Sequence, residues 1–253
     1  MNNFFGMIPS VLMIVSPILI TAVGGMICER SGVVNIALEG LMSIGAFAAA
    51  ATHVLLEGFF PGSIWVALLV GSLCGMLISV IHAFAAISLN ADQTVSGTGI
   101  NLLASGITVF FSQIIFRMDR TKPFQTGMMP GIFGIYPTAL IAIIVVLISW
   151  FVLYKLPFGL RLRACGEDPS VAASVGIKVK RTRYIAVLVS GFLAGLAGGC
   201  LVFTQTIQYT SNTINGAGYI ALAAVSFGRW RPAGISASSL LFGSAVAFSI
   251  YVV

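Results

Sequence analysis

The chain has 253 residues, of which 58% are hydrophobic and only 8% are charged, with a formal net charge of +6. A mean hydropathy of +1.04 excludes a water-soluble domain, because one fold cannot keep that much apolar surface from water. The basic residues flank apolar runs and are not interleaved with aromatic residues, so they indicate membrane topology and not nucleic-acid binding.

Seven apolar runs are long enough to cross a bilayer as helices, which takes about 20 residues each. They are 8–28, 33–56, 64–89, 97–116, 136–155, 184–206 and 233–253. A shorter run, 219–228, predicts half of a broken helix or a re-entrant segment. The sequence therefore predicts an all-α, polytopic integral membrane bundle with seven or eight membrane segments in a single domain, 1–253.

The distribution of Lys and Arg predicts the orientation. If the spans alternate and 156–183 is cytoplasmic, ten basic residues lie inside: Arg30, Lys155, Arg161, Arg163, Lys178, Lys180, Arg181, Arg183, Arg229 and Arg231. Three lie outside: Arg117, Arg120 and Lys122. This asymmetry favours an external N-terminus, and it makes the uncharged stretch 205–218 an extracytoplasmic loop.

The second run contains polar residues at four-residue spacing, Asn35, Glu39 and Ser43, which predicts that they share one helix face. A carboxylate inside a membrane span is costly, by roughly 2.5–3.5 kcal/mol on insertion scales, and normally faces the bundle interior or a water-filled cavity. Two interpretations remain open: Glu39 borders a translocation path, or it is a structural clamp to a neighbouring helix.

The fourth run carries a stripe of small polar side chains at spacings of four and three, which places them on one side of a helix. They are Thr94, Thr98, Asn101, Ser105, Thr108 and Ser112. Such a stripe can line a path for a polar, uncharged solute, or it can serve close helix packing. Asp92 and Gln93 are expected at the mouth of the path, with Gly97 and Gly99 allowing an unwound start.

Glycines spaced as GxxxG predict close helix packing within the bundle. They are Gly71 and Gly75 in the third run, and Gly191, Gly195 and Gly199 in the sixth. The two histidines, His53 and His82, lie near span ends, and we expect hydrogen-bonded interfacial side chains and not a proton relay.

The 156–183 loop contains a short helix with signals at both ends. Asp168 suits the N-cap, Pro169 suits the first helical position, and Gly176 suits the left-handed residue that closes a helix. A helix of about two turns is marginal in water by itself. Its end signals therefore predict that a soluble partner docks against it.

Sequence motifs for chemistry are missing. The chain has no G-x-x-x-x-G-K-[ST], HExxH or GxSxG motif, so we expect no catalytic residue, and any ATP hydrolysis belongs to another subunit. Cys28, Cys74, Cys165 and Cys200 lack CxxC spacing, so neither a disulfide nor a metal site is expected.

Four stretches resemble the permease subunits of ABC importers of the branched-chain amino acid and simple-sugar class, especially the second permease of lipoprotein-dependent nucleoside importers. They are GGMICERSGVVNIALEGLMSIGAFAAA at 24–50, ADQTVSGTGINLLASGI at 91–107, LRACGEDPSVAASVGIKVKRTR at 162–183, continuing to Gly199, and ALAAVSFGRWRPAGISASSLLFG at 221–243. The resemblance implies that the short cytoplasmic helix is the coupling helix, which sits in a cleft of the ATPase subunit. The matching residues are Gly166, Glu167, Asp168, Pro169, Ala172, Ala173, Gly176 and Ile177.

The resemblance also implies the partners: ATPase subunits that hold ATP and magnesium, a second homologous permease, a substrate-binding lipoprotein or periplasmic protein, and membrane lipid. The protein is then expected in the bacterial cytoplasmic membrane, as a non-enzymatic import subunit without a cofactor of its own. Family members continue beyond 221–243 with further helices, so a chain ending at Val253 is expected to be short relative to the family.

For the solute, the resemblance favours nucleosides, which are neutral and rich in hydroxyl groups. Riboflavin and simple sugars suit the same polar lining. The alternative of a different class is an ion-coupled secondary transporter, with Glu39 or Asp92 as the proton or ion site. Sensitivity of uptake to ATP or to ionophores distinguishes the two classes.

Overall fold

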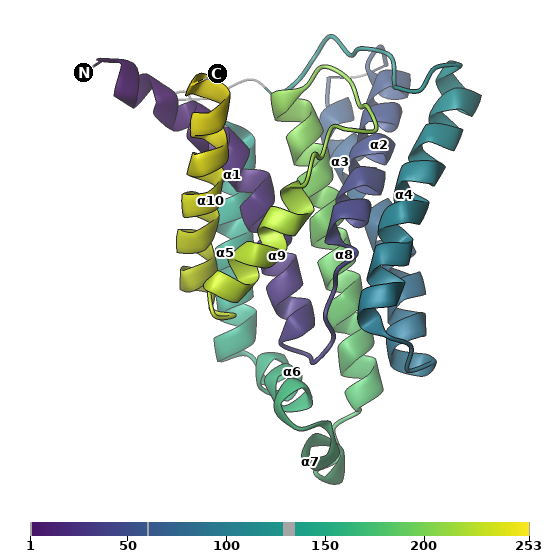
Figure 1. Cartoon of the computed structure of the whole chain (residues 1–253), viewed down its shortest axis with the longest axis vertical. Helices are drawn as coiled ribbons and strands as arrows, with labels where there is room; N and C mark the ends of the chain where they lie inside the picture. The colour runs from purple at the N-terminus through teal and green to yellow at the C-terminus, as the bar shows by residue number, and fades with distance from the viewer. Residues whose placement is uncertain (1, 60, 129–134, 253) are drawn as a thin grey trace.

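The computed structural model describes residues 2–59, 61–128 and 135–252, and the side chains of 9–59, 61–128 and 135–249. Figure 1 shows a bundle of helices in the order α1 (Asn2–Glu29), α2 (Leu38–Leu56), α3 (Ser63–Ala83), the π-helical turn η1 (Phe84–Ser88), α4 (Gln93–Phe116), α5 (Pro137–Lys155), α6 (Pro157–Glu167), α7 (Pro169–Ser174), α8 (Val179–Gln205), α9 (Ala217–Phe227) and α10 (Pro232–Val252). Within this part of the chain, the β-structure is a single bridge between Arg120 and Thr210.

The predicted membrane segments are confirmed. Among the described residues, seven helices are long and apolar enough to cross a bilayer, and each overlaps one of the seven predicted runs. The short run at 219–228 is the helix α9, whose 11 residues are too few to span. Figure 1 shows α9 lying obliquely at mid-height, as expected of a broken segment.

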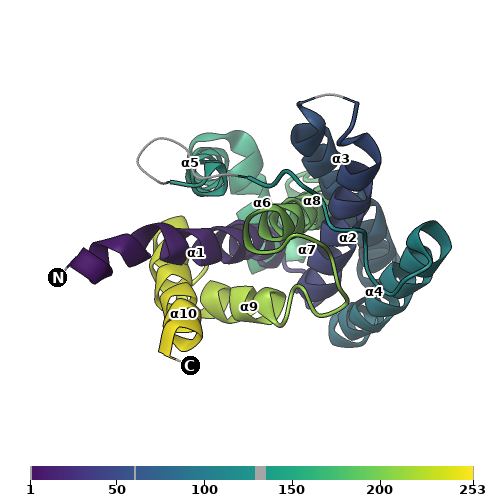
Figure 2. The ribbon, with the colours of Figure 1, turned by 90° about the horizontal axis from the view of Figure 1, so that it is seen from above.

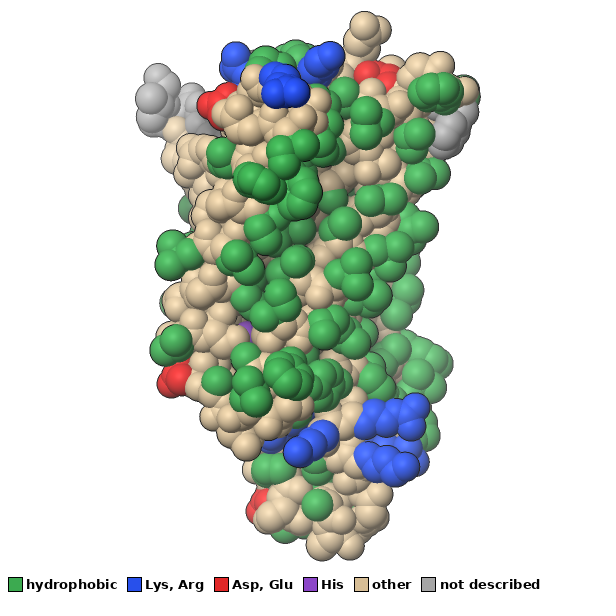
Figure 3. Space-filling view, turned by 90° about the vertical axis from the view of Figure 1, so that its right-hand side faces the viewer, with side chains coloured by type: hydrophobic (Ala, Val, Ile, Leu, Met, Phe, Trp, Pro, Cys, Tyr) green, Lys and Arg blue, Asp and Glu red, His purple; other side chains and the backbone are tan. Residues whose placement is uncertain are grey.

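The two ends of the bundle differ in charge. In Figure 1, α6 and α7 form one end, whereas both termini and the α4–α5 connection lie at the other. The turn between α9 and α10 lies near the end of α1, because Arg30 donates from Nη2 to the carbonyl oxygen of Trp230 at 2.9 Å. Figure 3 shows basic side chains at both ends and a hydrophobic band between them. The excess of Lys and Arg lies at the α6–α7 end, so the prediction that this end faces the cytoplasm refers to α6 and α7.

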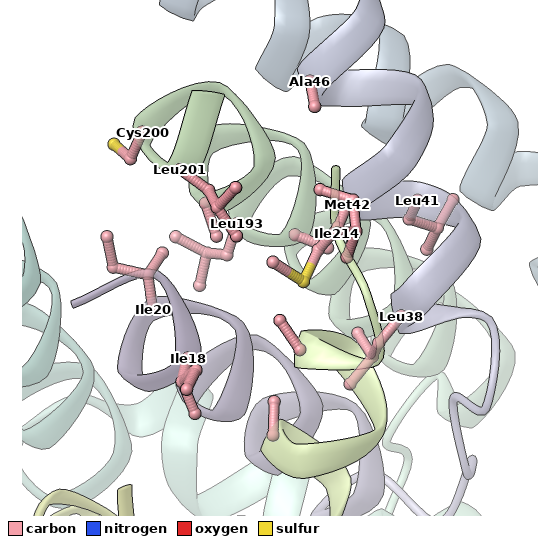
Figure 4. Close-up of a cluster of buried hydrophobic side chains, with 14 of the residues drawn as sticks. Ile18, Ile20, Leu38, Leu41, Met42, Ala46, Leu193, Cys200, Leu201 and Ile214 are labelled. Carbon is pink, nitrogen blue, oxygen red and sulfur yellow. The ribbon is translucent and has the colours of Figure 1, made fainter. Parts of the chain in front are cut away.

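The helix α8 is the centre of the bundle. It packs against α1, α2 and α3, and Figure 2 shows α4 and α10 further out. Figure 4 shows apolar side chains of α1, α2 and α8 gathered in one cluster, among them Ile20, Met42 and Leu193. Because the surrounding lipid is equally apolar, this core holds together through close packing and not through burial alone.

Glycines set the closest approaches. A Cβ atom on Gly45 would collide with the backbone of Gly195, and one on Gly75 would collide with the carbonyl oxygen of Gly191. Likewise, a Cβ atom on Gly195 would meet the carbonyl oxygen of Gly71 at 2.5 Å. The GxxxG spacings therefore bring α2, α3 and α8 into backbone contact, as predicted.

Three predicted boundaries are corrected by the structure. The second span begins at Leu38 and not near 33, because the segment 30–37 is non-helical and turns at Gly32, whose φ is 84°. The fourth begins at Gln93, and the sixth at Val179. In the last case the helix begins with charged residues, which a hydropathy criterion leaves out.

The 156–183 segment contains a second helix, α6, that sequence reasoning missed. Pro157 occupies its first position, and Leu162 and Cys165 are buried while the opposite face is exposed. Its mixture of charged and apolar residues conceals an amphipathic helix from an average hydropathy. The segment is thus mostly helical and not an open loop.

Both histidines are buried and hydrogen-bonded, as predicted. A ring nitrogen of His53 lies 2.8 Å from the carbonyl oxygen of Thr126, and the other lies 3.1 Å from Ser63 Oγ. The ring nitrogens of His82 lie 3.0 Å from Ser96 Oγ and 3.0 Å from the carbonyl oxygen of Val34. Each histidine ties a loop to a helix near one end of the bundle.

Candidate functional site

Two helices begin inside the bundle, and Glu39 joins them. Glu39 lies in the first turn of α2, and its Oε1 and Oε2 accept hydrogen bonds from the backbone N–H groups of Gly216 (2.8 Å) and Gly218 (2.7 Å). These groups belong to the start of α9, where N–H groups lack partners within the helix and carry partial positive charge. The carboxylate therefore satisfies the N-terminus of a broken helix, which accounts for its tolerance inside a membrane.

Asn101 of α4 completes a polar cluster with the same two helix starts. Its Oδ1 accepts from the backbone N–H of Gly40 (2.8 Å), and its Nδ2 donates to the carbonyl oxygen of Ile36 (3.0 Å) and to Tyr219 Oη (3.0 Å). Asn101 thus binds the backbone on both sides of the start of α2 and a side chain in the first turn of α9. A side-chain amide offers donors and acceptors together, which this position requires.

Tyr219 is the residue of this cluster that sequence reasoning missed. Its side chain is about half exposed, at 49%, although its hydroxyl is bound to Asn101. Hydropathy predicts only a short apolar segment at 219–228. The available signal was a tyrosine directly after the Gly216-Ala-Gly218 sequence, at the start of a helix too short to span.

The polar stripe on α4 divides into two parts. Thr94, Thr98 and Ser105 are exposed on this chain, whereas Thr108 and Ser112 are buried. The stripe is therefore not a continuous lining within one chain. Its exposed part begins near the cytoplasmic end and extends past Asn101.

The expected unwound start of α4 is wrong. The helix is regular from Gln93, and Asp92 is its N-cap, with Oδ1 accepting from the backbone N–H groups of Thr94 (2.8 Å) and Val95 (2.9 Å). Gln93 Oε1 accepts from the backbone N–H of Val34 at 2.7 Å. Asp92 and Gln93 therefore fix the start of the helix.

Asn35 and Glu39 do not share a helix face, because Asn35 precedes α2. It is fully buried, and its Nδ2 donates to Ser190 Oγ at 2.9 Å, which ties the non-helical segment to α8. The third member of the predicted set, Ser43, is within α2 and lies 2.7 Å from Tyr209 Oη. The four-residue spacing gave a wrong prediction because its first member, Asn35, lies before the residue at which the helix begins.

The second candidate site is the short helix α7, at the end of the bundle that α6 and α7 form. Asp168 is its N-cap, as predicted: Oδ1 accepts from the backbone N–H groups of Ser170 (2.8 Å) and Val171 (3.1 Å) and from Ser170 Oγ (2.6 Å). These hydrogen bonds, that of the Ser170 side chain first, lower the pKa of Asp168. Pro169 is at the first helical position, as expected.

The closing turn of α7 is also as predicted. The backbone N–H of Gly176 donates to the carbonyl oxygen of Ala173 (3.0 Å), that of Ile177 donates to the carbonyl oxygen of Ala172 (3.1 Å), and Gly176 has a φ of 85°. This pair of bonds is the Schellman pattern of helix ends. Ala172 is buried, whereas Ala173 and Glu167 are exposed. The helix is closed at both ends without help from a neighbour.

Two apolar side chains, one in α7 and one at its C-cap, are exposed. Val171 is 59% exposed and Val175 is 71% exposed. Figure 1 shows α7 protruding at the tip of the α6–α7 end. This surface is available to a soluble partner.

The base of α7 is fixed to α1 and α8. A Cβ atom on Gly166 would collide with the carbonyl oxygen of Arg30, so the end of α6 touches the turn after α1. Arg183 of α8 donates from Nε to the carbonyl oxygen of Ser31 (3.0 Å) and from Nη2 to that of Cys165 (3.2 Å). The turn that the end of α6 touches in this way leads through 31–37 to the start of α2.

Metal binding has no support in the geometry. In the three described ranges, no group of three or more His, Cys, Asp and Glu side chains comes together in a way that could hold an ion.

Comparison with known proteins agrees with the geometry. Residues 7–253 match the family model described as "Branched-chain amino acid transport system / permease component". The chain is 45% identical to the guanosine ABC transporter permease protein NupQ of Bacillus subtilis, over 96% of this chain and 81% of that protein. It is 38% identical to the nucleoside ABC transporter permease protein NupC of Lactococcus lactis, over 96% of this chain and 81% of that protein.

A further relative, 32% identical over 94% of this chain and 75% of that protein, is the putative glucose ABC transporter permease protein TsgC13 of Haloferax volcanii. With seven spanning helices and these relatives, the protein is a multi-pass membrane protein of the bacterial cytoplasmic membrane. The chain belongs to the family of branched-chain amino acid type permease components of ABC transporters.

Proposed function

We propose that the chain is the nucleoside-conducting permease subunit of an ATP-driven importer. The observation that carries the proposal is the cluster of Glu39, Asn101 and Tyr219 at two helix starts inside the bundle, in a chain 45% identical to a guanosine permease. Broken helices that meet near the middle of the membrane are a common way to build a transport site.

The chemistry of the cluster suits a nucleoside. Tyr219 offers a half-exposed aromatic ring on which a base can stack, a contact worth roughly 1–3 kcal/mol in nucleic-acid binding. The hydroxyl groups of Thr98 and Ser105 donate to backbone carbonyl oxygens of α4, and their oxygens can accept from the hydroxyl groups of a ribose. Simple sugars lack the stacking group, although they suit the same hydroxyl lining.

The exposed part of the α4 stripe supports a second permease as partner. Thr94, Thr98 and Ser105 are polar groups on the outer surface of a membrane helix. Polar residues in membrane helices normally face a protein partner or a water-filled cavity. A homologous permease beside α4 would place this surface, with Tyr219, along a path between the two subunits.

The α7 surface supports ATPase subunits as partners, and these would hold ATP and magnesium. Closure of the ATPases would push on Val171 and Val175 of α7. The contact of Gly166 with Arg30 and the hydrogen bonds of Arg183 would pass this push to 31–37 and to the start of α2. A substrate-binding protein would dock at the opposite end.

Uptake in reconstituted vesicles tests the proposal. The chain, its second permease, the ATPase and the binding protein are reconstituted with radiolabelled guanosine or glucose as solute. We expect guanosine uptake that requires ATP and withstands an ionophore. Uptake that continues without ATP and stops with the ionophore would instead indicate an ion-coupled transporter, and preference for glucose would move the solute class to sugars.

Tyr219→Leu gives the matched test of the solute site. We expect the KM for guanosine to rise about tenfold, because stacking is lost while the side-chain volume is largely kept. Tyr184→Leu, whose hydroxyl lies 2.6 Å from Ser88 Oγ outside the cluster, is the control. Equal effects of the two substitutions would contradict a solute contact at Tyr219.

A further inference from the structure

A basic pocket lies beside α7, where α8 begins. It has a volume of about 510 Å³, and its lining includes Arg161, Lys178 and Arg181. Among the described residues, no carboxylate lies within 4.0 Å of these three cationic groups. Lys178 and Arg181 belong to the start of α8, whose N-terminus adds partial positive charge. The pocket is thus arranged for an anion.

One wall of the same pocket is apolar, and part of it also borders a neighbouring groove. Phe158 and Ile185 line the basic pocket. Phe158 also lines a groove of about 330 Å³ between α5 and α8, whose lining begins on α8 at Ala186, the residue after Ile185. With Ser149 as its one hydroxyl-bearing residue, the groove is lined by Ile27, Val145, Ile148, Val152, Leu153, Phe158, Ala186, Val189, Phe192, Leu193 and Leu196.

The basic pocket and the apolar groove meet at Phe158, which lines both. We propose that together they bind an anionic phospholipid, with the phosphate at Arg161, Lys178 and Arg181 and one acyl chain in the groove between α5 and α8. Basic pockets beside membrane helices on the cytoplasmic side are suited to anionic headgroups. The inference does not depend on the solute.

The apolar groove favours a lipid over an acidic segment of a partner protein as the occupant of this site. An acidic segment would match the basic pocket, but it has no reason to enter an apolar groove between two membrane helices. A free phosphate would likewise leave the groove empty. Val175 and Gly176, at the end of α7, also line the pocket. A bound lipid therefore supports the base of the helix proposed to couple to the ATPase.

Lipid retention tests the inference. The protein is purified with its partner subunits from bilayers of phosphatidylglycerol and phosphatidylcholine, and bound phospholipid is counted by native mass spectrometry. The triple variant Arg161→Gln, Lys178→Gln, Arg181→Gln is compared with Arg117→Gln, Arg120→Gln, Lys122→Gln, which removes the same charge at the opposite end. We expect the first to retain at least about tenfold less phosphatidylglycerol, and the second to retain as much as wild type.

Val189→Trp fills the groove without changing charge, and Arg161→Gln alone covers the case in which the triple variant does not fold. We expect both to lower retention of phosphatidylglycerol, the latter by about fivefold. Unchanged lipid retention in the triple variant, or in Arg161→Gln if the triple variant does not fold, would overturn the proposal. Full retention of phosphatidylglycerol in Val189→Trp would also overturn it. So would a triple variant that loses the ATPase but keeps the lipid, because the pocket would then be a protein contact.

Discussion

Arg183, near the start of α8, donates a hydrogen bond of 3.0 Å from Nε to the carbonyl oxygen of Ser31, in the turn that follows α1. The same side chain reaches the carbonyl oxygen of Cys165 at 3.2 Å, so it joins the base of α7 to the segment that leads into α2. Arg183 thus connects the end that carries α7 to the segment that precedes the polar cluster.

Arg183→Gln is expected to uncouple ATP hydrolysis from transport. A charged hydrogen bond is worth roughly 1.5–3 kcal/mol, so we expect uptake to fall by about tenfold or more while ATPase activity continues. The exposed Lys180, one residue from the basic pocket's Arg181, gives the control Lys180→Gln. Uptake and hydrolysis that fall in proportion would show that Arg183 does not act in coupling.

Asp168→Lys and Ala173→Asp are expected to abolish ATPase association while the spans stay inserted. The first removes the cap of α7 and reverses its charge, and the second adds a charge to the exposed face. Co-purification of the ATPase measures the effect. Asp119→Lys, at the opposite end of the bundle, is the control and should retain the ATPase. If the α7 variants co-purify as much ATPase as this control, α7 is not the docking helix.

The N-cap of α7 is expected to stay formed in mild acid. The hydrogen bonds from Ser170 and Val171 lower the pKa of Asp168 below its ordinary value of 3.8, so the ionised carboxylate stabilises the cap at all pH values above that value. Its contribution is lost only as the pH falls through the lowered pKa. Hydrogen exchange should show that the backbone amides of α7 keep their protection from about pH 8 to about pH 5. In Asp168→Ala the same amides should be less protected at every pH in this range. Fraying of the wild-type helix within this range would argue against the cap.

Glu39→Gln is expected to weaken the start of α9. The carboxylate accepts from two backbone N–H groups, whereas a glutamine side chain has one oxygen and would turn an N–H donor toward the other. A buried N–H left without a partner costs roughly 1–3 kcal/mol. We expect a lower Tm and slower uptake. If the solute range is unchanged, Glu39 is a clamp; a changed range would place it on the path.

Gly198→Ala is expected to destabilise the bundle. The added Cβ atom would collide with the carbonyl oxygen of Met42 and approach the backbone nitrogen of Ala46 to 3.0 Å. Overpacking of this kind costs roughly 1–3 kcal/mol, which thermal unfolding in detergent can measure. Gly58→Ala, where a Cβ atom meets nothing within 4 Å, is the matched control. Equal Tm values for the two variants would contradict the close contact of α2 and α8.

Local chemistry decided what the sequence predicted correctly. A span of apolar residues has few alternatives to a membrane helix, so the seven segments followed from hydropathy. Asp168, Pro169 and Gly176 specified α7 because a cap, a fixed φ and a left-handed closing residue act within a few residues of one another. Hydropathy failed at α6 and at the start of α8, because charged residues lower the average hydropathy of both segments.

The polar cluster depended on tertiary structure. Glu39, Asn101 and Tyr219 are far apart in the chain, and a membrane carboxylate can be satisfied by any nearby set of donors. Its partners were decided by where α9 starts and by how closely α2 approaches α4 and α8, which glycine contacts such as Gly45 with Gly195 permit. The sequence by itself determined which segments are helices in the membrane, because that depends on local transfer free energy. Only the packed bundle decided which helix ends meet, because that depends on contacts between residues distant in the chain.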